Sequence, residues 1–196
     1  MNAPSDGRTL RRSRNRDAVI AALLELIRED NLSPGAAEIA ERAGVSHRSV
    51  FRYFDDLNDL VRTAIRQDFL AAEPLIEIPN IGKGTLGERV ANLVDARLAL
   101  YEYVRGTALV ARMRAGSMPD IDAEIATVNM FYREQLRQHF EEELDARSQD
   151  ETESIIDAGL VLTSFDSFDL HQQMLGHDVD AIRASWTTSL LALLSG

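Results

Sequence analysis

A short polar run at residues 46–49 has the side chains needed to hydrogen-bond to a nucleic acid. The run follows Gly44, a glycine that ends one helical pattern just before another begins. An arginine at the exposed start of a helix can donate two hydrogen bonds to a guanine, and hydroxyl groups can reach base edges or phosphates. The predicted DNA contacts of this segment are Ser46, His47, Arg48, Ser49, Arg52 and Tyr53.

These side chains have different expected roles. Arg48 is the best candidate to read a base, because its guanidinium matches the two acceptors of guanine. His47 could donate to a base or cap its own helix, and both roles stay open. Tyr53 is expected to touch a phosphate rather than act only as a packing strut, whereas Phe51 has no hydroxyl and is expected to pack.

The first sixteen residues hold five arginines against a single acid, Asp6. Such a composition is typical of a segment that meets phosphates, and equally of a disordered tail that aids solubility. We predict a flexible basic arm over residues 1–16, with Arg12 and Arg14 as phosphate contacts.

The whole chain is acidic, and this balance alone would argue against a nucleic-acid partner. Its 196 residues carry a formal net charge of −11. Residues 1–66, however, contain 11 arginines against ten acids, so the acidic excess lies in the remainder. The charge therefore indicates which end would bind DNA. The chain has no cysteine, which excludes a disulfide framework, a thiolate zinc site and a cysteine nucleophile.

Helical periodicity dominates the elements that must position these residues, and strand signals are almost absent. The pattern predicts about nine helices: 17–29, 36–43, 47–54, 55–72, 86–105, 106–115, 120–144, 150–175 and 179–194. Prolines and glycines make residues 73–87 the only long break. We predict an all-α chain with a flexible arm (1–16), a three-helix helix-turn-helix head (17–54), a connecting helix (55–72) and a helical body (73–196).

The spacing of Ala40, Gly44 and Val50 is that of a helix-turn-helix, with a small residue at the crossing, a glycine in the turn and a branched residue in the second helix. Residues 37–54, with Asp55–Leu60 after them, resemble the DNA-binding domain of the tetracycline-repressor (TetR) family of transcriptional regulators. The resemblance implies a homodimer that binds a palindromic operator in double-stranded DNA. It also implies a body that binds a small effector and thereby releases the DNA. Repression is the family's usual outcome.

Two positions depart from the family pattern. Gly35 stands where the family often has a threonine, and Leu57 stands where it has a lysine at the start of the fourth helix. At Gly35 the family's contact must come from backbone N–H groups or be missing, and Leu57 removes a common phosphate clamp. The arginine-rich arm would therefore carry more of the electrostatic attraction. They also favour the alternative function, a helical small-molecule-binding or scaffolding protein whose helix-turn-helix no longer binds DNA.

The body is expected to hold the effector pocket and the dimer face. Aromatic and sulfur side chains on the presumed inner faces predict a pocket for a small, mostly apolar effector, lined by Tyr101, Met113, Met130, Phe131 and Tyr132. Apolar stripes on the last two predicted helices indicate cover on two sides, which an isologous dimer would supply. The predicted dimer contacts are Phe165, Phe168, Ile182, Trp186, Leu190 and Leu193.

Other motifs carry little weight. Residues 82–87 spell a glycine-rich G-x-G-x-x-G, but no strand precedes it and no parallel sheet is available. His171 and His177 do not have the spacing of a helical ligand pair. Because no catalytic motif is present, we expect neither an enzyme nor a metal or cofactor. No apolar run is long enough to span a membrane and no secretory signal is visible, so a cytoplasmic protein is expected.

Overall fold

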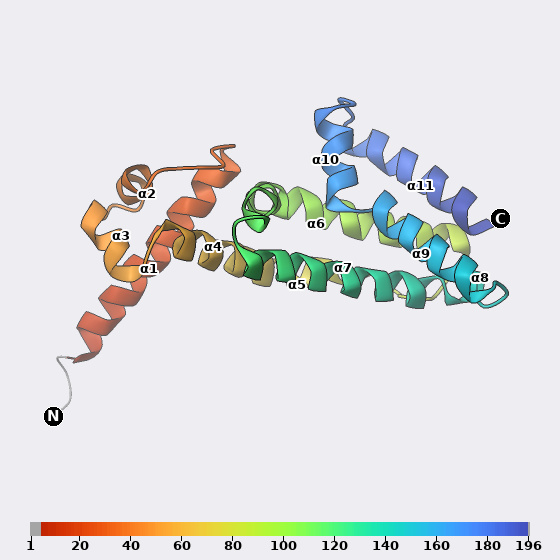
Figure 1. Cartoon of the computed structure of the whole chain (residues 1–196), viewed down its shortest axis with the longest axis horizontal. Helices are drawn as coiled ribbons and strands as arrows, with labels where there is room; N and C mark the ends of the chain where they lie inside the picture. The colour runs from red at the N-terminus through yellow and green to blue at the C-terminus, as the bar shows by residue number, and fades with distance from the viewer. Residues whose placement is uncertain (1–4, 196) are drawn as a thin grey trace. The chain divides into compact units, whose positions relative to one another are not determined.

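The structure is a computed structural model that describes residues 5–195, in which helices joined by turns and loops are the only regular elements and there is no strand. The all-α prediction is therefore confirmed (Figure 1). In chain order the helices are α1 (Ser5–Arg28), α2 (Ala36–Arg42), α3 (His47–Tyr53), α4 (Leu57–Ala71), α5 (Glu73–Ile76), α6 (Leu86–Ala115), α7 (Pro119–His139), α8 (Glu141–Leu144), α9 (Gln149–Leu162), α10 (Phe165–Gln173) and α11 (Val179–Ser195).

The arginine-rich segment is not a separate arm from Ser5 onward, which corrects the prediction for that part of the chain. Residues 5–16 are the first half of α1, a helix of 24 residues. The segment up to Arg16 has no proline after residue 4 and is rich in arginine, which is a good helix former. The arginines are therefore held on a helix. Residues 1–4 lie outside the described range.

Several predicted boundaries in the body were also wrong. The two helices expected over 86–115 form one 30-residue helix, α6, which runs straight through Gly106. A helix expected over 150–175 is divided, because Ser164 accepts a hydrogen bond from the Ser167 amide and starts α10 as its N-cap. The segment expected over 120–144 ends α7 at His139 and adds the short α8.

The chain divides into two compact units, and the division differs from the predicted one. Unit 1 comprises the residues up to Ala71 together with Val104–Ser117, and unit 2 comprises Ala72–Tyr103 and the residues from Met118 onward. Helix α6 thus contributes its first part to unit 2 and its last part to unit 1. Sequence periodicity cannot show this, because it reports which face of a helix is buried and not what covers that face.

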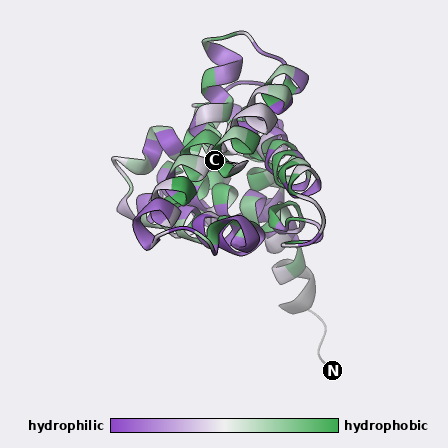
Figure 2. Cartoon of the chain, turned by 90° about the vertical axis from the view of Figure 1, so that its right-hand side faces the viewer, coloured by the Kyte–Doolittle hydropathy of each residue, from purple (hydrophilic) through white to green (hydrophobic). Residues whose placement is uncertain are grey.

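Each unit has its own apolar core. In unit 1 the core is formed by one face of α1 with α2, α3 and α4, where Ile20, Ile39, Val50 and Leu60 are almost fully buried. In unit 2 it includes Leu93, Phe168, Ile182 and Trp186. Figure 2 shows apolar stretches toward the middle of the helical bundle and hydrophilic ones mostly on its outside. Within residues 5–195, no helix combines the length and apolarity required to cross a bilayer.

The last part of α6 is tied to α1 and α4 inside unit 1. Asp68 of α4 is buried, and it accepts hydrogen bonds from Arg28 of α1 (2.7 Å) and from the Thr107 hydroxyl of α6 (2.6 Å). Beside this cluster, a Cβ placed on Gly106 would lie only 2.6 Å from Cγ2 of Ile27. Gly106 is therefore the residue that lets α6 approach α1 so closely.

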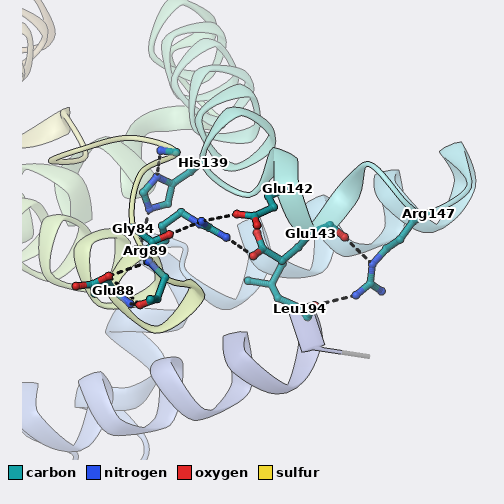
Figure 3. A network of polar contacts seen from close by, with 10 residues as sticks. Gly84, Glu88, Arg89, His139, Glu142, Glu143, Arg147 and Leu194 are labelled. Carbon is teal, nitrogen blue, oxygen red and sulfur yellow. Dashed lines mark hydrogen bonds and ion pairs between the residues drawn. The ribbon is translucent and has the colours of Figure 1, made fainter.

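The glycine-rich motif at residues 82–87 starts α6 and holds it in place, and it has no strand before it. Thr85 and Glu88 form reciprocal cap hydrogen bonds at the start of the helix. His139 of α7 accepts a hydrogen bond from the Gly82 amide at Nδ1 (3.0 Å), and its Nε2 lies 2.8 Å from the Arg89 carbonyl (Figure 3). The motif is thus explained by capping and anchoring of a helix.

Arg89, next to this anchor, is a buried arginine with two carboxylate partners. Its guanidinium donates to Glu142 (2.9 Å), to Glu143 and to the Gly84 carbonyl (Figure 3). Its side chain is only 3% exposed. The buried cation is thus neutralised by acids at the α7–α8 junction, as buried charges normally are.

Candidate nucleic-acid interface

The turn between α2 and α3 depends on a backbone conformation that suits glycine. Gly44 has a φ of 65°, in the left-handed region. Its amide donates to the Glu41 carbonyl (3.1 Å), and the Val45 amide donates to the Ala40 carbonyl (3.0 Å). These bonds end α2 in the usual way for a helix followed by a left-handed residue. They redirect the chain so that α3 starts three residues later.

Helix α3 begins with a side-chain cap. The Ser46 hydroxyl accepts a hydrogen bond from the Ser49 amide (3.2 Å), and the two serine hydroxyls lie 2.8 Å apart. Ser46 therefore caps the helix, and His47 is released from that role. His47 and Arg48 are both exposed, and the His47 ring packs edge-on against Phe51 at 5.1 Å. The first turn of α3 thus presents an imidazole and a guanidinium to solvent, while Val50 in the next turn is buried.

The end of α3 meets the first half of α1. The Tyr53 hydroxyl accepts hydrogen bonds from Arg52 (2.6 Å) and from the Asn15 side chain (3.3 Å). Burial of the hydroxyl would raise the pKa of Tyr53, but these hydrogen bonds and the charges of Arg52 and Arg12 outweigh it and lower the pKa. Arg12, Arg52 and Tyr53 therefore belong to one electropositive cluster.

The arginines of α1 extend this cluster along the helix. Arg11, Arg12 and Arg14 are exposed, and the Arg16 guanidinium lies 4.9 Å from the centre of the Phe54 ring. Asn15 and Arg16 were not predicted to contact α3 or the residue after it. No signal in the sequence could have shown their contacts, because they join residues 38 positions apart. Figure 1 shows α1 running beside α2, α3 and α4 in this unit.

The two departures from the family pattern leave different local chemistry. Gly35 is the extended N-cap residue of α2, with no side-chain hydrogen bond. At the start of α4 the Asp56 carboxylate accepts from the Asp59 amide (2.7 Å), and the Asp59 carboxylate accepts from the Asp55 amide (3.3 Å). The acids cap α4 and complement its dipole, but they place negative charge where the family has a lysine.

The predicted pocket residues are not all buried. Tyr101 and Tyr132 are buried in unit 2. Met113, Met130 and Phe131 are respectively 60%, 63% and 50% exposed, and Met113 belongs to unit 1. The expectation that all five line an inner face is wrong, because adjacent helical residues such as Phe131 and Tyr132 point about 100° apart.

Most of the predicted dimer contacts are buried within the protomer. Phe168, Ile182, Trp186 and Leu190 are at most 1% exposed, so they stabilise unit 2 and offer almost no surface to a partner. Phe165 and Leu193 remain partly exposed. The apolar stripes of the last two helices were correctly predicted to be buried, but other helices of the same protomer bury them, and no dimer partner is needed. The exposed apolar residues of this region, which periodicity did not single out, are Val161, Leu170, Met174 and Leu175.

Comparison with known proteins supports the interpretation of unit 1. Residues 19–64 match the family described as bacterial regulatory proteins, tetR family. No curated protein sequence matches the chain. A crystal structure of a transcriptional regulator from Rhodococcus sp. Rha1 is similar to this structure, with a TM-score of 0.70 and 17% sequence identity over 92% of this chain and 96% of that one. At this identity the likeness shows a shared fold. The helix-turn-helix of unit 1 therefore matches the DNA-binding domain of the TetR family, and the chain as a whole shares the fold of a transcriptional regulator.

Proposed function

We propose that the protein binds a palindromic operator as a homodimer and represses transcription until a small-molecule effector releases it. The observation that carries the proposal is the first turn of α3, where Ser46 caps the helix and leaves His47 and Arg48 exposed. The N-terminal residues of a recognition helix are the ones that reach base edges in the major groove.

The basic face of α1 supplies the sequence-independent part of this binding. Exposed Arg11, Arg12 and Arg14 are carried on a helix whose Asn15 contacts the end of α3. Arginines on this helix can contact phosphates on either side of the groove that α3 enters. They compensate for the lysine that Leu57 replaces.

Dimerisation rests on the exposed apolar residues around α9 and α10. Val161, Leu170, Met174 and Leu175 are each about half exposed or more in one protomer. Large apolar side chains left in solvent on α9, on α10 and just after α10 favour an interaction surface in this region. A two-fold dimer would place two copies of α3 about 34–36 Å apart, or a multiple of a helical turn, and so specify the operator's half-site spacing.

Helix α6 offers a route for release by an effector. Its last part is fixed in unit 1 by the Thr107–Asp68–Arg28 hydrogen bonds and by the close approach of Gly106 to Ile27. An effector that binds unit 2 more tightly in one conformation of α6 would shift the protein toward that conformation, and unit 1 would follow because it contains the last part of α6. This arrangement favours DNA release by a small displacement of one helix.

Selection of duplexes from a random pool by the full-length protein tests the proposal. We expect an inverted repeat to be enriched, and the selected duplex to bind about 10³-fold or more tightly than a shuffled one at physiological salt. The protein–DNA complex should contain two protomers in light scattering. Absence of any enriched sequence would contradict the proposal and favour a scaffold or small-molecule-binding protein with an inactive helix-turn-helix.

A further inference from the structure

Arg97 of α6 is a fully buried cation in unit 2. Only 1% of its surface is exposed, and it is among the largest buried side chains of the chain. Arginine keeps its charge at any pH that a protein tolerates. Burying such a charge is unfavourable unless an anion or several hydrogen-bond acceptors compensate for the water that is lost. The partners of Arg97 therefore need to be accounted for.

Those partners are neutral. Arg97 Nη2 donates to the Gln135 side-chain oxygen (2.8 Å), and the guanidinium lies 3.8 Å from the centre of the Tyr132 ring. Gln135 is held in turn by its donation to the Ile76 carbonyl (3.0 Å). Among residues 5–195 no carboxylate forms an ion pair with Arg97, and its Nη1 is buried without an acceptor. The Tyr132 ring and the Gln135 amide oxygen orient the guanidinium, but the N–H groups of Arg97 Nη1 have no acceptor.

The other buried arginine of unit 2 makes the contrast clear. Arg89 is paired with Glu142 and Glu143. Arg97 lies two helical turns further along α6, and burial lowers its pKa, opposed only by Tyr101 and Tyr132. The same core therefore contains one neutralised arginine and one that is not.

A second buried donor, the indole N–H of Trp186, lies near Tyr101. Tyr101 is one turn after Arg97 on α6, and its ring packs edge-on against Trp186 with 6.4 Å between ring centres. The Trp186 Nε1 is buried and has no acceptor among the described residues. The Tyr101 hydroxyl itself donates to the Thr163 carbonyl (2.9 Å). The surroundings of Tyr101 are thus apolar and aromatic, and rich in donors relative to acceptors.

We propose that Arg97 recognises the carboxylate of a small organic acid with an apolar body, and that this acid is the effector. The inference rests on the proposed function for its role and adds the chemical class of the ligand. Nη1 would donate to the carboxylate, while the aromatic side chains of Tyr101 and Tyr132 contact the body of the ligand. Because Arg97 is enclosed, the acid must part α6 and α7 around it, and it therefore binds an opened state preferentially.

Thermal unfolding of the full-length protein tests this assignment. The probes are the sodium salts of butanoic, hexanoic, octanoic, benzoic and phenylacetic acids at about 1 mM, each compared with its primary amide and with sodium chloride at the same concentration. We expect at least one acid to raise the Tm by several degrees, and its amide and chloride to have no effect. If no acid stabilises the protein, or if an amide or chloride does so equally, the proposal is overturned.

Variants separate recognition from packing. Arg97→Met should weaken the active acid at least about tenfold in calorimetry, because the charged partner is lost. Arg133→Met, which removes a cation of α7 that already pairs with Glu153 and Asp157, should bind the acid like wild type. Without ligand, Arg97→Met should have a Tm equal to or above that of wild type, since the buried charge is removed. A lower Tm with unchanged acid affinity would make Arg97 a packing residue and overturn the proposal.

Two further measurements keep the inference distinct from the proposed function. If Arg97→Met does not fold, the comparison of each acid with its amide on the wild-type protein decides, and Trp186 fluorescence reports binding independently, because Trp186 contacts Tyr101. The active acid is then added to the protein bound to its selected duplex. Release of the duplex supports both proposals. Acid binding without release leaves the carboxylate site established and contradicts the effector role.

Discussion

The two units of this chain differ in charge and in how they treat charge in their interiors. By sequence, unit 1 contains 14 basic and 11 acidic residues, a net of +3, whereas unit 2 contains seven basic and 21 acidic residues, a net of −14. The overall charge of −11 therefore hides a basic unit that can approach phosphates and an acidic one that phosphates repel. The charge of each unit therefore indicates which end of such a molecule would bind DNA, whereas the net charge of the whole chain does not decide whether it binds.

The interiors differ in a second way. In unit 1 the buried carboxylate of Asp68 has both a cation and a hydroxyl as partners. In unit 2 the buried cation of Arg97 has only an amide oxygen and an aromatic ring. A complete polar cluster fixes the packing of helices, whereas an incomplete one is a place where a ligand can improve it. We therefore assign a structural role to the first and a binding role to the second.

Removing the cation from the complete cluster should have the largest effect on stability. Arg28→Ala leaves the Asp68 carboxylate, 3% exposed, with only the Thr107 hydroxyl, and we expect a loss of about 3 kcal/mol in the free energy of unfolding. Urea unfolding measures it. The double variant with Asp68→Asn should recover part of the loss. The matched control is Arg183→Ala, which breaks an exposed ion pair with Asp95 and should cost less than about 1 kcal/mol. Equal losses of unfolding free energy in Arg28→Ala and Arg183→Ala would contradict a structural role for the buried Asp68 cluster.

A methyl group at the α1–α6 contact should disturb unit 1 alone. In Gly106→Ala the new Cβ would meet Ile27 Cγ2 at 2.6 Å and the Ile27 carbonyl oxygen at 3.0 Å, and we expect a destabilisation of about 1–3 kcal/mol. Gly87→Ala is the control in the same helix. It has no neighbour within 4 Å, and because it lies in the first turn of α6 the gain in helix propensity should be small, at most about 0.5 kcal/mol. Two variants that shift stability in the same direction would contradict the close contact.

Phosphate contacts from α1 should show in the salt dependence of binding. Arg12→Ala should weaken the selected and the shuffled duplex alike, and the slope of log K against log salt should become about one unit less steep. Fluorescence anisotropy at several salt concentrations measures both quantities. Arg137→Ala in acidic unit 2 serves as the control and should leave the slope unchanged. If the slope changed in Arg137→Ala but not in Arg12→Ala, the phosphate contacts would lie in unit 2, which contradicts the prediction.

The smallest expected effect is on pH dependence. Burial lowers the pKa of His139, as do the charges of Arg89 and Arg97, and only its hydrogen bond to the Arg89 carbonyl and the charge of Glu143 oppose this. The unfolded chain therefore takes up the proton first as the pH falls below about 6.5, and stability is lost down to the folded pKa. His139→Gln keeps a neutral acceptor and donor at this position, so it should lose less stability than wild type between about pH 7.5 and pH 5.5. Equal losses in urea unfolding would contradict a neutral, buried imidazole.

Local patterns predicted the helix-turn-helix well because its determinants are close together in sequence. The spacing of Ala40, Gly44 and Val50 and the serine cap at Ser46 are all fixed within eleven residues. The exposed start of α3 follows from them. The all-helical body was also predictable from periodicity.

Long-range contacts could not be predicted in the same way. The Asn15–Tyr53 and Arg28–Asp68–Thr107 contacts join residues 38 to 40 positions apart, and nothing in a single sequence pairs them. The buried stripe of α11 was visible, but the identity of its cover was not, and so core residues such as Trp186 were assigned to a dimer face. Likewise Gly106 was expected at a helix break, because only the approach of Ile27 explains a glycine inside α6.

Sequence-specific DNA binding through the first turn of α3 is the central claim, and the ratio of affinities for the selected and shuffled duplexes tests it most directly. We expect Arg48→Ala to lower this ratio by about 10- to 100-fold, equivalent to roughly 1–3 kcal/mol of base discrimination, and Arg12→Ala to leave it nearly unchanged. An unchanged ratio in Arg48→Ala, with equal loss of affinity for both duplexes, would contradict the claim.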